Sequence, residues 1–196
     1  MKLVRLVLIS TVLFTLAASP IFAQAAPPAP AKPLSPEELA KREQLKKDCN
    51  ALLDRFAANK WVNETTNETG VLKAELSFER VLNNQFLSGS LAVRDSSGKI
   101  TFESRLMLTF NWGVGQYLVY SFESDGWSRM FLGEPNAEQM MVQGVIPGGV
   151  EHYRWKITPE GNLERAFWKA SKEMKIADIP PDEVIVFTPV KPPEKK

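Results

Sequence analysis

The segment from Lys99 to Glu123, KITFESRLMLTFNWGVGQYLVYSFE, constrains the fold more than any other part of the chain. Its first half alternates between apolar and polar residues, as in a strand with one face in a core. The turn NWGVG follows, and a second apolar run completes a long β-hairpin. In the second arm, Tyr117, Val119 and Ser121 are then expected on the face that points away from the core. The other face carries the large apolar side chains of both arms: Ile100, Phe102, Leu106, Leu108, Phe110, Leu118, Tyr120 and Phe122.

The chain after Trp61 repeats this alternation of short strands and tight turns. No connection has room for a crossover helix, so successive strands are expected to pair antiparallel. We predict an all-β fold with one N-terminal helix, an antiparallel up-and-down β-barrel of about eight to ten strands over 60–190, and a disordered tail over 191–196. A strongly curved, incompletely closed sheet is the alternative. The predicted strands are 60–67, 71–82, 85–94, 99–110, 116–123, 127–133, 138–145, 149–158 and 162–170, with Glu183–Pro189 as a further candidate.

The first 25 residues are predicted to be a secretory signal peptide. Lys2 and Arg5 precede an apolar run over 6–16, and small residues offer cleavage after Ala23 or Ala25. The apolar run is too short to span a membrane, and no second one follows. We therefore expect an exported protein, periplasmic or secreted, with no integral membrane segment in the mature chain.

A Pro/Ala-rich linker over 26–34 leads into an amphipathic helix expected over 35–59. Ser35 is a capping residue, Pro36 suits the first helical position, and Glu38 completes a capping box. Apolar side chains then recur with helical spacing, which predicts one stripe that docks on the barrel. The stripe consists of Leu45, Cys49, Leu52, Leu53 and Phe56.

Composition excludes several classes of function. Lys and Arg number 24 against 23 Asp and Glu, and without basic clusters we expect no nucleic-acid partner. Cys49 is the sole cysteine, so no internal disulfide forms, and a buried, unreactive thiol is favoured over a reactive one. The single histidine excludes metal sites that need two imidazoles, and the common catalytic motifs are missing. We predict neither a cofactor nor a metal.

The one histidine, His152, lies in the strand VEHYRWKIT. It alternates with Arg154 and Lys156, while Tyr153 and Trp155 occupy the other face. If the aromatic side chains point into the barrel, His152 points to solvent. A haem or metal ligand and an acid/base residue remain as alternatives.

Two arginines lie in phase with apolar neighbours. Arg80 shares a face with Phe78 and Leu82, and Arg129 shares a face with Phe131. An arginine inside a barrel needs a partner, because an unpaired buried charge is costly. Two partners are possible: first, a carboxylate of this chain, and second, the carboxylate or phosphate of a bound ligand. A wrongly assigned strand phase is the remaining alternative.

Short motifs in the order of a known exported family follow the helix. They are Asn59-Lys60-Trp61, Glu79 to Leu87, Leu108 to Asn111, Tyr117, Phe122 to Gly126, and Gly133. From about 52 to 171 the chain resembles the domain-of-unknown-function family 1579, a bacterial family with a calycin-like barrel. Ala58-Asn59 stands where that pattern usually has a glycine before the tryptophan. The resemblance implies a lipocalin-like barrel and supplies no catalytic residues.

The predicted function is a non-catalytic domain that binds a small apolar or amphipathic ligand inside the barrel. One alternative is an enzyme that uses His152 or a carboxylate in the barrel cavity. Another is an envelope carrier of lipid or protein built on an open half-barrel. The candidate ligand-binding residues are Arg80, Arg129, Phe78, Phe102, Tyr120 and Trp155.

Overall fold

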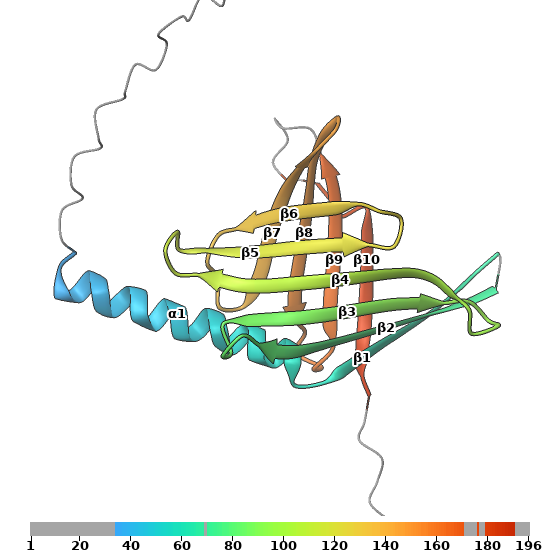
Figure 1. Cartoon of the computed structure of the whole chain (residues 1–196), viewed down its shortest axis with the longest axis horizontal. Helices are drawn as coiled ribbons and strands as arrows, with labels where there is room; N and C mark the ends of the chain where they lie inside the picture. The colour runs from blue at the N-terminus through green and yellow to red at the C-terminus, as the bar shows by residue number, and fades with distance from the viewer. Residues whose placement is uncertain (1–33, 69, 171–175, 177–178, 191–196) are drawn as a thin grey trace, which may run out of the picture. The chain divides into compact units, whose positions relative to one another are not determined.

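The computed structural model describes residues 34–68, 70–170, 176 and 179–190. Within this part of the chain, one helix, α1 (Pro36–Ala57), precedes ten antiparallel strands that close into a barrel (Figure 1). The predicted barrel is confirmed, and the incompletely closed sheet is excluded. The predicted signal peptide, most of the linker and the tail lie outside the described residues. The strands are β1 (Lys60–Asn67), β2 (Gly70–Val81), β3 (Phe86–Arg94), β4 (Ile100–Asn111), β5 (Gln116–Glu123), β6 (Ser128–Gly133), β7 (Gln139–Ile146), β8 (Gly149–Ile157), β9 (Leu163–Ala170) and β10 (Glu183–Pro189).

Strand β10 closes the barrel by pairing with both β9 and β1. Each strand otherwise pairs with its neighbours in sequence, as an up-and-down meander requires. Figure 1 shows β2 to β6 running side by side, with β7 to β10 crossing behind them at a steep angle. The barrel therefore resembles two sheets packed across each other and joined at corners.

The corner between β6 and β7 depends on two glycines. These strands pair in register at a single position, and their backbones approach closely around it. A Cβ atom on Gly133 would collide with the Met141 carbonyl oxygen, and one on Gly144 would lie 2.7 Å from the Phe131 ring. The lack of a side chain at Gly133 and Gly144 lets the sheet turn here.

Helix α1 begins as predicted and covers one end of the barrel with its apolar stripe. The Ser35 hydroxyl accepts from the Glu38 amide at 3.3 Å, and the Glu38 carboxylate accepts from the Ser35 amide at 2.7 Å. The Trp61 indole N–H donates to the Phe56 carbonyl at 2.8 Å, which fixes the end of the helix against the first strand. The fully buried helix residues are Cys49, Leu52, Leu53 and Phe56.

Polar contacts also join the helix to strand β2 and to the β4–β5 turn. Arg80 of β2 forms an ion pair with Asp54 of α1 at 2.7 Å and donates to the Asn50 carbonyl at 3.0 Å. The Lys46 ammonium lies 4.7 Å from the ring centre of Trp112, in the β4–β5 turn. We call this the capped end. The opposite end, which includes the β3–β4 and β5–β6 turns, is the mouth.

The sequence analysis predicts the wrong inner face for β5. Phe110 of β4 pairs with Tyr117, so Tyr117, Val119 and Ser121 face the interior. Tyr120 faces outward, and Phe122 is 52% exposed. Both faces of β5 are apolar, so alternation alone does not choose between them. The four residues between the paired Asn111 and Gln116 set the register and, with it, the inner face.

Candidate ligand-binding cavity

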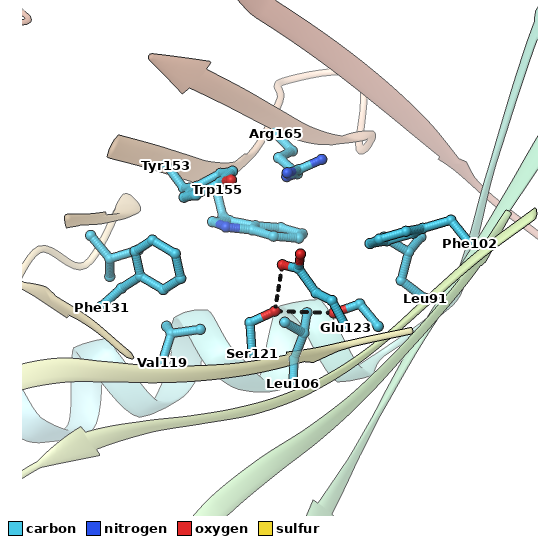
Figure 2. A pocket seen from close by; sticks show the side chains of 12 residues that line it. Leu91, Phe102, Leu106, Val119, Ser121, Glu123, Phe131, Tyr153, Trp155 and Arg165 are labelled. Atoms are coloured by element: carbon cyan, nitrogen blue, oxygen red, sulfur yellow. Dashed lines mark hydrogen bonds between the residues drawn. The ribbon is translucent and has the colours of Figure 1, made fainter. Parts of the chain in front are cut away.

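A cavity of about 80 Å³ lies inside the barrel and is partly open to solvent (Figure 2). This space accommodates about five to eight water-sized groups. It is smaller than the roughly 300–1,000 Å³ of pockets that hold drug-sized molecules. The cavity therefore suits a small ligand or one end of a longer one. Its apolar walls consist of Leu91, Phe102, Leu106, Val119, Phe131, Val142 and Trp155.

A row of three polar side chains crosses the wall formed by β4 and β5. The Ser104 and Ser121 hydroxyls lie 3.1 Å apart, and Ser121 donates to Glu123 Oε1 at 3.1 Å. Because the Ser121 proton is used on Glu123, Ser104 donates to Ser121. The lone pairs of Ser104 then remain as acceptors toward the cavity.

Arg129 lies between two carboxylates beside this row. Its guanidinium contacts Glu123 at 3.3 Å and Glu151 at 2.6 Å, and Glu151 is only 8% exposed. Burial alone would lower the pKa of Arg129, but the two carboxylates outweigh it and raise that pKa above its usual value. The chain's own carboxylates thus satisfy the Arg129 charge, as the first of the two sequence interpretations proposed.

Arg165 of β9 occupies the opposite wall and has a different environment. Its guanidinium carbon lies 4.8 Å from the ring centre of Tyr153 and 5.7 Å from that of Trp155. Among the described residues, no carboxylate approaches Arg165 within 4.0 Å. Burial raises the pKa of Tyr153, so its hydroxyl stays protonated beside Arg165. Figure 2 shows Arg165 and Glu123 coming from opposite walls.

The structure separates the six residues predicted for the site. Phe102 and Trp155 line the cavity. Phe78 lies in the packed core, with its ring centre 6.1 Å from that of Phe56 of the helix. The Arg80 side chain is 15% exposed and binds α1. Arg129 binds Glu123 at the cavity edge, and Tyr120 lies on the outer face because of the β5 register.

Sequence reasoning missed two charged residues of this region. Arg165 is in phase with Leu163 and Phe167, which is the same signal that singled out Arg80 and Arg129. Glu151 is in phase with the aromatic face of its strand, Tyr153 and Trp155, and this alternation is the signal that could have found it. The serine row carries no such signal, because its members meet only through the β4–β5 register.

His152 lies on the outer face of β8, opposite Gln143 and Trp168. It is half-buried, and burial lowers its pKa. Tyr153 and Trp155 face inward, so the predicted division of this strand into two faces is confirmed.

The described residues form no group of three or more His, Cys, Asp or Glu suited to a metal ion. In the same part of the chain, no helix has the length and apolar character to cross a membrane.

No family model matches the chain, and no curated protein matches it either.

Proposed function

We propose that this chain is a non-catalytic binding domain whose barrel holds a small apolar or amphipathic ligand. The partly open internal cavity carries this proposal, because it combines apolar walls with a short polar row. A few oriented polar groups in an otherwise apolar cavity are typical of ligand sites in proteins. Export after signal-peptide cleavage, and membership of the domain-of-unknown-function family 1579, are part of the proposal and rest on the sequence.

The two alternative functions have less support. An enzyme that uses His152 would need this side chain in the cavity, whereas it lies on the outer face. The carboxylates near the cavity, Glu123 and Glu151, are held by Arg129. The open half-barrel carrier is excluded in the predicted form, because the barrel is closed.

Native mass spectrometry of protein purified from its exporting cells, without detergent, tests the proposal. A discrete added mass is expected, and it would identify the class of ligand. Binding of an apolar fluorescent dye, one end of which can enter the partly open cavity, provides a second readout. Val119→Phe fills part of the cavity and should abolish dye binding.

A matched control addresses dye that binds to the outer surface. Met130 lies on the outer face of β6 and is 52% exposed, so Met130→Gln removes apolar surface outside the cavity. This variant should bind the dye as the wild type does. A bare polypeptide mass, together with dye binding that only Met130→Gln reduces, would contradict a ligand cavity.

A further inference from the structure

Three arginines of the described strands point toward the barrel interior, and they differ in how their charges are satisfied. Arg80 binds Asp54 of the helix, and Arg129 binds two carboxylates. Among the twelve residues that line the cavity, Arg165 is the one cation, and no carboxylate of the described chain pairs with it. Its neighbours on this wall are the rings of Tyr153 and Trp155.

A guanidinium placed in this way is suited to bind an anion. The aromatic rings stabilise its face, and the Tyr153 hydroxyl can accept a hydrogen bond from one of its N–H groups. The other N–H groups need acceptors that the rings do not supply in the guanidinium plane. Water is displaced from this wall when an apolar ligand enters. A ligand that brings its own carboxylate would replace the lost hydrogen bonds with stronger, charge-assisted ones.

Glu123 shares the cavity with Arg165 but does not prevent anion binding there. One of its oxygens accepts from Ser121 and the other pairs with Arg129. Its charge is therefore balanced on its own side of the barrel. The two groups come from β5 and β9, which form opposite walls.

The size of the cavity and the number of donors narrow the class of anion. One planar guanidinium matches one carboxylate, with two parallel N–H···O bonds. A phosphate dianion would need further cationic donors, and no other cation lines the cavity within the described part of the chain. The volume of about 80 Å³ limits the enclosed part of the ligand to roughly five to eight heavy atoms.

We propose that Arg165 binds the carboxylate of a small aliphatic monocarboxylic acid whose apolar body occupies the cavity. This inference rests on the proposed function and specifies its ligand class. The tail of the acid contacts Leu91, Phe102 and Leu106, and the carboxylate lies at the β9 wall. The acid is of about four to six carbons, since longer chains must extend out of the cavity.

Calorimetric titration with hexanoate and with hexanamide tests this inference. The two probes have nearly the same shape, and they differ in charge. The wild type is expected to bind hexanoate about 10- to 100-fold more tightly than hexanamide, as one charge-assisted pair predicts. Arg165→Gln should remove this preference and leave hexanamide binding unchanged.

Arg105→Gln is the matched control, because Arg105 is an exposed arginine on the outer face of β4. It removes the same charge and should keep the preference for hexanoate. If Arg165→Gln does not fold, the comparison of hexanoate with hexanamide binding to the wild type still tests the inference. The carboxyl group of ¹³C-labelled hexanoate should then show a lower pKa when bound than when free.

The outcomes separate this inference from the proposed function. Equal binding of both probes, unchanged in Arg165→Gln, would overturn the role of Arg165 and leave the binding cavity in place. No binding of either probe would overturn this inference, whereas the proposed function fails only if native mass spectrometry also finds no added mass and dye binding does not depend on the cavity. Tighter binding of hexylamine than of hexanoate would also overturn the inference, since it would assign the charged contact to Glu123.

Discussion

The two ends of the barrel use the same strands for different purposes. At the capped end, side chains of α1 fill the interior, and two buried aromatic side chains bond to backbone carbonyls, Trp61 to that of Phe56 and Tyr117 to that of Asn136. Toward the mouth, charged and hydroxyl groups face a cavity. Close packing concentrates stability at the capped end, and incomplete packing toward the mouth leaves space for a ligand.

The largest expected effect is the loss of stability on removing a phenylalanine at the capped end, compared with the same change at the cavity. Phe56 is fully buried at the capped end, so Phe56→Ala should lower the free energy of unfolding by about 3–5 kcal/mol. Phe102 lines the cavity and is only half-buried. Phe102→Ala should cost less than about 2 kcal/mol, because its ring already borders empty space. Urea denaturation measures both, and equal losses would contradict the comparison.

Near the mouth, Arg129 is the one residue whose removal is expected to cost much stability. Arg129→Met should lower the free energy of unfolding by about 2–4 kcal/mol, because it leaves Glu123 and Glu151 without their partner. The double variant Arg129→Met/Glu151→Gln should recover part of this loss. Chemical denaturation of the four members of this double-mutant cycle gives the coupling. Strictly additive losses would show that the pair is not coupled.

A smaller effect is expected from the arginine at the capped end. Arg80→Ala should lower the free energy of unfolding by about 1–2 kcal/mol, since it removes contacts with Asp54 and the Asn50 carbonyl. Hexanoate affinity should stay the same, because this side chain binds the helix. A loss of affinity without a loss of stability would return Arg80 to the ligand site.

The smallest effect concerns pH. Burial lowers the pKa of His152 in the folded protein, so the unfolded chain takes up a proton first as the pH falls. Stability should therefore decrease from about pH 6.5 downward and level off below the folded-state pKa. His152→Gln removes this component. Denaturation midpoints of the two proteins between pH 5 and 8 measure it, and parallel curves would contradict it.

Most of the fold could be predicted from the sequence, because turns and alternation are local signals. The helix start at Ser35 and the candidate strand Glu183–Pro189 are examples. The inner face of β5 could not be predicted, since both of its faces are apolar and the β4–β5 register decides between them. The partner of Arg80 could not be predicted either, because Asp54 lies 26 residues earlier in the chain and only the docking of α1 brings the two side chains together.

Methyl NMR of isotope-labelled protein during titration with hexanoate tests the central claim most directly. We predict chemical-shift changes at Leu91, Leu106, Val119 and Val142 around the cavity, while Leu52 and Leu53 of the helix stay unchanged. Changes confined to the helix methyls, or to outward-facing methyls such as those of Val145, would show that the ligand binds elsewhere and would contradict the division between a packed end and a binding end.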